Sequence, residues 1–118
     1  MIPFQITFRD FPTSDAVWLA VQGRVEKLET FFDQIVKCDV VVSAPHRHRH
    51  ADRIYHVQIH LKIGGKDIFI NRDPERDEAH ADIYVAVRDA FDAAERLLRR
   101  RVEKMRREVK HHQSPAPA

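Results

Sequence analysis

Residues 55–71, YHVQIHLKIGGKDIFIN, contain the clearest structural pattern in this 118-residue sequence. Apolar and polar side chains alternate strictly over residues 55–63, which predicts a strand with one face on a core and the other in water. Gly64-Gly65 follows directly and favours a two-residue turn, because glycine adopts positive φ without steric cost. Residues 66–71 then predict a returning strand, with Ile68 and Ile70 facing inward. The segment therefore predicts a β-hairpin.

Two further strands are expected before this hairpin. Residues 4–9 alternate between apolar and polar side chains, which predicts a half-buried strand. Residues 35–44 are rich in β-branched residues, as in a central strand. Cys38, Val40 and Val42 share one face of that second strand with Ala44.

Two segments carry apolar residues at the three- and four-residue spacing of a helix. The first follows Ser14 or Thr13, either of which can cap it, and its stripe comprises Val17, Val21, Val25, Leu28 and Phe32. The second begins near Ala81 or Asp82, and its stripe comprises Ile83, Val87, Phe91, Ala94, Leu98, Val102, Met105 and Val109. A helix of that length would be about 40 Å long, so the part beyond roughly Arg100 is expected to extend past a small sheet.

The predicted order is β-α-β-β-β-α, an α+β fold. A four-stranded sheet with both helices packed on one face is the simplest way to bury these stripes. A right-handed crossover through the first helix would make the first two strands parallel. We expect one domain over residues 1–112 and a disordered tail over residues 113–118, which end in Ser-Pro-Ala-Pro-Ala.

Composition favours a globular protein of the cytoplasm. The chain is 43% hydrophobic and 32% charged, which is typical of a folded domain. It lacks an apolar run near the roughly 20 residues needed to cross a bilayer, and its first residues lack the pattern of a signal peptide. We therefore expect no membrane contact. Cys38 is the only cysteine, so no internal disulfide can form, and its apolar surroundings predict a buried, unreactive thiol.

The formal net charge is only +2, but the cations are concentrated near the C-terminus. Between residues 96 and 110, eight cations are opposed only by Glu103 and Glu108, so this segment carries +6 and the rest of the chain −4. Most charge runs are solvated helix faces, but so large an excess of one sign favours a polyanionic partner such as nucleic acid. The eight cations are Arg96, Arg99, Arg100, Arg101, Lys104, Arg106, Arg107 and Lys110.

Several helical segments resemble the hibernation-promoting factor and ribosome-associated inhibitor family, also described as sigma-54 modulation proteins or ribosomal S30 proteins. Residues 24–29, RVEKLE, and residues 31–33, FFD, resemble the family's basic-x-x-Lys-Leu-Glu and the aromatic pair after it. Residues 82–87, DIYVAV, resemble its Asp-Met-Tyr-x-Ala-Ile, and Arg96 with Leu98 resembles its Arg-Gln-Leu. With the strand order and the double-glycine hairpin, the resemblance to the short form of the family covers nearly the whole chain.

The resemblance implies a fold similar to a double-stranded-RNA-binding domain and a site on the small ribosomal subunit, in the channel used by messenger and transfer RNA. It implies a translation inhibitor of the hibernating ribosome, with the small subunit and ribosomal RNA as partners. Occupying a channel needs no chemistry, so we expect no enzymatic activity, no cofactor and no small-molecule substrate. A monomer off the ribosome is expected, and pairing through the dimerisation domain of the long family form is not.

By position, the resemblance assigns ribosomal RNA contacts to Arg24 and Lys27 in the first helix and to Arg96 and Arg100 in the last. Arginine binds phosphate in a bidentate manner, and cations three or four residues apart share one helix face. The basic segment adds further candidates for these contacts, namely Arg99, Lys104 and Arg107.

Three features depart from the family pattern. Ala93 stands where the family commonly has a lysine, which removes one cation from the expected site. Residues 71–82 form a predicted loop that is longer and more acidic than in the shortest members. Residues 46–50, HRHRH, are not part of the general pattern.

Eight histidines are unusual in a chain of this length. Those on one face could ligate zinc or nickel, with Asp52 or Glu78 completing a site, although their spacing matches no closed structural zinc site. They could instead gain charge in acid and strengthen an RNA contact, or be solvated polar residues. The candidate metal ligands are His46, His48, His50 and His80, while His56 and His60 are predicted on the exposed strand face.

Three functions therefore remain under consideration. A ribosome-binding translation inhibitor is favoured by the resemblance and by the basic last helix. A metal-binding or metal-sensing protein would use the histidines, and a general RNA-binding module would use the same cations without ribosome specificity. Hydrolytic enzymes are not predicted, because the sequence contains no nucleophile elbow, HExxH motif or phosphate-binding glycine loop.

Overall fold

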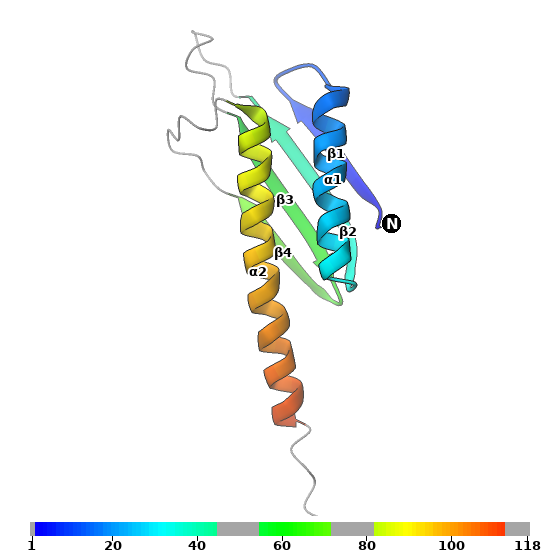
Figure 1. Ribbon diagram of the computed structural model, residues 1–118, viewed down its shortest axis with the longest axis vertical. Helices are drawn as coiled ribbons and strands as arrows, with labels where there is room; N and C mark the ends of the chain where they lie inside the picture. The colour runs from blue at the N-terminus through cyan, green and yellow to red at the C-terminus, as the bar shows by residue number, and fades with distance from the viewer. Residues whose placement is uncertain (1, 45–54, 72–81, 113–118) are drawn as a thin grey trace, which may run out of the picture.

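The computed structural model describes residues 2–44, 55–71 and 82–112 (Figure 1). The elements follow the order β-α-β-β-β-α predicted from the sequence. They are β1 (Phe4–Arg9), α1 (Asp15–Phe31), β2 (Ile35–Ser43), β3 (His56–Ile63), β4 (Lys66–Asn71) and α2 (Ile83–His112). The predicted disordered tail, the histidine-arginine loop and nearly all of the acidic loop lie outside the described residues.

The four strands form one sheet in the order β1-β2-β3-β4. β1 pairs with β2 in parallel, as predicted, and Phe4 lies opposite Cys38. β2 and β3 are antiparallel, as are β3 and β4. The sheet is therefore mixed, with a single parallel pair at one edge.

The hairpin between β3 and β4 forms as its sequence predicts. Gly64 has φ 34° and Gly65 has φ 85°, so both turn residues are in the positive-φ region that a type I′ turn requires. Ile63 and Lys66 are paired across the turn, which fixes the register of both strands. Ile68 and Ile70 consequently face the core, and both are buried.

β2 begins with an irregularity that the alternating pattern does not show. Ile35 and Cys38 are both buried although they are an odd number of residues apart. The register against β3 shifts between Ile35 and Lys37. An extra residue in one strand reverses which side chains face inward, so Val36 is exposed and Ile35 still reaches the core.

Both helices cover one face of the sheet, and the core lies between the two layers (Figure 1). Ser14 caps α1: its Oγ accepts a hydrogen bond from the Val17 backbone N–H at 3.3 Å. Asp82 has the same role at the start of α2, where its Oδ1 accepts from the Tyr84 N–H at 2.9 Å. The largest fully buried side chains come from both layers and include Val21, Val25, Val40, Ile59, Leu61, Val87 and Leu98.

α2 continues well past the core. It has 30 residues and is therefore about 45 Å long, whereas Leu98 is the last buried residue among its described side chains. No side chain described from Arg99 to Arg107 is buried, as expected for a helix that extends beyond the sheet (Figure 1). Among the described residues, neither helix combines the length and the apolar character needed to cross a membrane.

Cys38 is fully buried and forms no disulfide, as predicted. Burial, and then the neighbouring Asp39 carboxylate, raises the pKa of its thiol from 9.0 to about 12. Because the thiolate is the reactive form, the folded protein holds this cysteine in an unreactive state at neutral pH.

Candidate nucleic-acid interface

The two helices that carry the predicted cations lie side by side on the sheet (Figure 1). Arg24 and Lys27 are on α1, and the remaining candidates, Arg96, Arg99, Arg100, Lys104 and Arg107, are on α2. Because α1 and α2 pack on the same face of the sheet, the structure brings both sets of cations to one side of the molecule. The opposite side is the outer face of the sheet.

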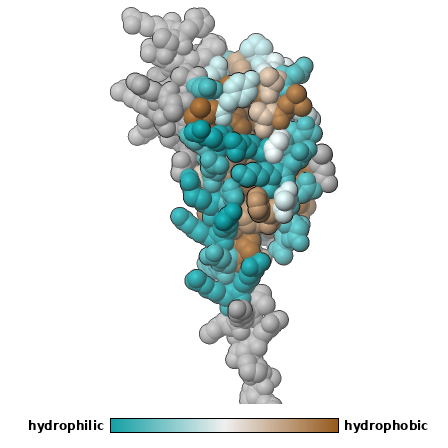
Figure 2. All heavy atoms as spheres, in the orientation of Figure 1, coloured by the Kyte–Doolittle hydropathy of each residue, from teal (hydrophilic) through white to brown (hydrophobic). Residues whose placement is uncertain are grey.

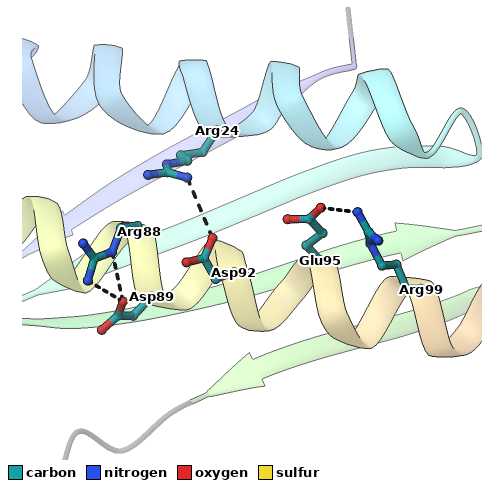
Figure 3. Close-up of polar contacts among 6 residues, drawn as sticks. All are labelled: Arg24, Arg88, Asp89, Asp92, Glu95 and Arg99. Carbon is teal, nitrogen blue, oxygen red and sulfur yellow. Dashed lines mark hydrogen bonds and ion pairs between the residues drawn. The ribbon is translucent and has the colours of Figure 1, made fainter.

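Arg24 is not free. Its guanidinium lies 3.8 Å from Asp92 Oδ1, which links α1 to α2 (Figure 3). Both side chains are partly exposed, at 32% and 42%, so solvent screens the pair and its contribution to stability is small. A phosphate could compete with Asp92 for this arginine, but Asp92 lowers the positive potential there.

Arg99 also has a carboxylate partner. It donates a hydrogen bond to Glu95 Oε1 at 2.8 Å, one helical turn earlier (Figure 3). Its guanidinium carbon also lies 5.9 Å from the ring centroid of Phe31, the last residue of α1. Two side chains, Glu95 and Phe31, therefore define the position of this arginine, which does not extend freely into solvent.

A second group of candidates has no such partner. Within the described part of the chain, no carboxylate lies within ion-pair distance of these exposed side chains, which are Lys27, Arg96, Arg100, Lys104 and Arg107. The four on α2 follow one another at spacings of four, four and three residues, so they share one face of the helix. We call these four side chains, Arg96, Arg100, Lys104 and Arg107, the α2 cation row.

The surroundings of the α2 cation row are strongly positive. Residues 99–107 contain six cations and one carboxylate, Glu103, a net charge of +5. Figure 2 shows that the surface over this part of α2 is mostly hydrophilic. A concentrated positive field on a solvent-exposed helix attracts polyanions, so the arrangement fits a nucleic-acid backbone.

The outer face of the sheet differs in charge. His60 Nδ1 lies 3.7 Å from Asp39 Oδ2 on β2, and its Nε2 lies 3.5 Å from Asp67 Oδ2 on β4. The ring stacks on Phe69 at 4.4 Å between centroids. Cations and carboxylates alternate here, since Lys37 Nζ also lies 3.8 Å from Asp39 Oδ2. Among the residues that the structure describes, this face offers no row of unpaired cations.

The described residues hold no group of three or more histidine, cysteine, aspartate or glutamate side chains that could bind a metal ion. Around His60 the two carboxylates contact opposite ring nitrogens, so one ion could not reach all three groups. The histidines considered as metal ligands, His46, His48, His50 and His80, lie outside the described residues.

Sequence reasoning missed two features of this surface. The Glu95–Arg99 pair could have been found, since residues four apart on a helix are neighbours, but Glu95 stands just before the basic segment that was counted. The contact between Phe31 and Arg99 could not have been found from spacing, because it depends on how α1 and α2 pack. One signal about Phe31 was available from the sequence: its position off the buried stripe of α1 indicates an exposed ring.

Comparison with known proteins gives consistent results. A sequence model of the sigma 54 modulation protein / S30EA ribosomal protein family matches residues 4–106. A protein of Deinococcus radiodurans named ribosome hibernation promotion factor is 28% identical over 118 residues, which are 98% of this chain and 58% of that protein. The chain thus spans a little over half the length of this relative.

Two solved structures share the fold. The N-terminal domain of Thermus thermophilus Protein Y has a TM-score of 0.61 at 19% identity, over 85% of this chain and 98% of that one. A ribosomal subunit interface protein from Coxiella burnetii has a TM-score of 0.64 at 15% identity, over 86% and 99% of the two chains. At such low identities these matches show the fold alone.

Proposed function

Because the chain belongs to the sigma 54 modulation protein / S30EA ribosomal protein family, we propose that it is a ribosome-associated hibernation factor that binds the small subunit and inhibits translation. The single observation that carries the proposal is the α2 cation row, which is exposed to solvent and unpaired with any described carboxylate. Unpaired cations can bind phosphates without first releasing a protein partner. The name of the Deinococcus radiodurans relative supports the same role.

The proposed contact is electrostatic and lies along the helices. Successive members of the α2 cation row are four, four and three residues apart, so they are spaced by roughly 4.5 to 6 Å along the helix axis. Each arginine can bind a phosphate through two parallel hydrogen bonds. Lys27 and Arg24 extend the surface onto α1, and Arg24 contributes less because Asp92 holds it.

We further propose that the protein occupies the channel of messenger and transfer RNA. A helix about 45 Å long, anchored on a sheet at one end only, can extend into a channel lined by ribosomal RNA. Occupying the channel would exclude the natural ligands, so inhibition requires neither a catalytic residue nor a bound cofactor. The place of action would be the cytoplasm, where the ribosomes are.

The binding unit in this proposal is residues 1–112, acting as one domain. The described sheet and helices share one hydrophobic core, and the family match extends across most of it, from residue 4 to residue 106. We expect this unit to be monomeric when it is not on a ribosome.

Co-sedimentation of the purified protein with separated ribosomal subunits, over a series of salt concentrations, tests the proposal. We expect binding to small subunits that weakens steeply as salt rises, because phosphate contacts release counterions. Failure to sediment with small subunits at low salt would refute it. Equal affinity for small subunits and for an unrelated RNA duplex would instead identify a general RNA-binding module.

A further inference from the structure

Phe31 is an exposed aromatic residue beside the cations of both helices. It is the last residue of α1, and 55% of its surface is accessible to solvent. It does not belong to the buried stripe of α1, which is formed by Val17, Val21, Val25 and Leu28. The ring therefore contributes little to the core, and its packing does not explain its position.

An arginine covers the ring. The guanidinium carbon of Arg99 lies 5.9 Å from the centroid of Phe31, within the range of a cation–π interaction. The same guanidinium donates a 2.8 Å hydrogen bond to Glu95. Lys27 lies one helical turn before Phe31 on α1, and no described carboxylate pairs with it. The ring thus lies against the Arg99 guanidinium and one helical turn from Lys27.

The other exposed aromatic residues lack these surroundings. Trp18 packs against Phe4 at 5.2 Å between ring centroids. Phe69 is 67% exposed, but it stacks on His60 on the outer face of the sheet. Among the aromatic rings that the structure describes, Phe31 is the one with an arginine over its face.

We propose that Phe31 and Arg99 form a stacking platform for one unpaired base of the bound RNA. This inference rests on the proposed function, and it adds that the RNA at this point is single-stranded. The flat face of a base stacks on an aromatic ring or on a guanidinium plane. In a duplex those faces are covered by neighbouring bases, so only an unpaired base can reach the ring. Lys27 and the α2 cation row would hold phosphates of the same strand.

A salt series with Phe31→Leu tests the platform. Leucine keeps an apolar side chain and removes the π face. We expect affinity for small ribosomal subunits to fall about 5-fold or more, the usual loss for one base–aromatic stack. The fall should be the same at every salt concentration, because stacking releases no counterions. Arg99→Ala, in contrast, should make the dependence on salt less steep.

Two further variants complete the design. Phe31→Trp keeps an aromatic face and should bind at least as tightly as the wild type. Phe69→Leu removes a more exposed phenylalanine from the outer face of the sheet and should leave affinity unchanged. Phe31 and Phe69 are both exposed, so circular dichroism should show the wild-type fold in the three phenylalanine variants.

The outcomes separate this inference from the proposed function. Wild-type affinity in Phe31→Leu would overturn the platform, and so would a changed salt dependence, since Phe31 would then only position Arg99. If the wild type itself does not bind small subunits, the proposed function fails. The comparison is then made by fluorescence anisotropy on a labelled single-stranded oligoribonucleotide. Equal binding by the wild type and by Phe31→Leu there would overturn the platform as well.

Discussion

Replacing Arg96 and Arg100 with alanine together removes half of the α2 cation row and tests its role directly. Both side chains are exposed, and alanine is the best helix former. The pair is also four residues apart, so its removal relieves a like-charge contact. We therefore expect the thermal unfolding midpoint of the double variant to equal or exceed that of the wild type, while its ribosome affinity falls.

The size of the effect follows from counterion release. Each phosphate contact contributes about 0.7 to 0.9 to the slope of log affinity against log salt. Removing two contacts lowers the magnitude of the slope by about 1.4 to 1.8. Raising the salt from 50 to 200 mM should therefore weaken binding of the wild type about 7- to 12-fold more than binding of the double variant. At the lower salt concentration its affinity should already be at least about 100-fold weaker, since hydrogen bonds to charged groups contribute about 1.5 kcal/mol or more for each of the two arginines.

Fluorescence anisotropy with a labelled protein and purified small subunits, repeated at four or five salt concentrations, measures both quantities. The matched control is Lys62→Ala with Lys66→Ala, which lowers the net charge equally but acts at exposed positions of the β3–β4 hairpin. Its slope should equal that of the wild type. A control slope reduced as much as in the arginine variant would show that net charge, and not this helix face, governs binding. An unchanged slope in the arginine variant would refute the proposed surface.

Three further predictions concern the fold. Gly23→Ala should raise the free energy of unfolding in urea by about 1 kcal/mol, because alanine is the better helix former and an added Cβ meets nothing within 4 Å. Ser14→Ala should lower it by about 1 kcal/mol through loss of the α1 cap, and Thr13→Ala should not. The pKa of Cys38 is 9.0 before folding and about 12 after it, so above pH 9 the unfolded chain loses its proton first. Stability should fall with rising pH by up to about 1.4 kcal/mol per unit relative to Cys38→Ala, and the two proteins should show parallel pH profiles below pH 9.

The order and pairing of the elements were predictable because local rules determine them. Alternation over residues 55–63 has only one register that buries its apolar side chains, and Gly64-Gly65 supplies the turn that joins β3 to β4. The α1 stripe and the Ser14 cap were likewise found from spacing alone. In each case the deciding residues are within a few positions of one another.

Features that depend on packing were not predictable. Alternation through β2 gives the buried face from Cys38 onward but not the shift that also buries Ile35. The Arg24–Asp92 pair joins residues on different helices, so it depends on how α1 lies against α2. For the candidate site, the sequence predicted on which helix each cation lies, as the structure has it, but could not show which cations are paired with carboxylates.

The distinction between paired and unpaired cations explains how one helix can serve both the fold and the proposed interface. The described core side chains of α2 end at Leu98. Two carboxylates of α2 are paired with cations, Asp92 with Arg24 of α1 and Glu95 with Arg99 of α2. Beyond Leu98 the cations mostly repel one another, at a few tenths of a kcal/mol for each like-charged neighbour on the helix. A polyanion bound along this face would replace that repulsion with attraction. Binding energy thus comes from residues that the core does not need, so the arginine variants can separate affinity from folding.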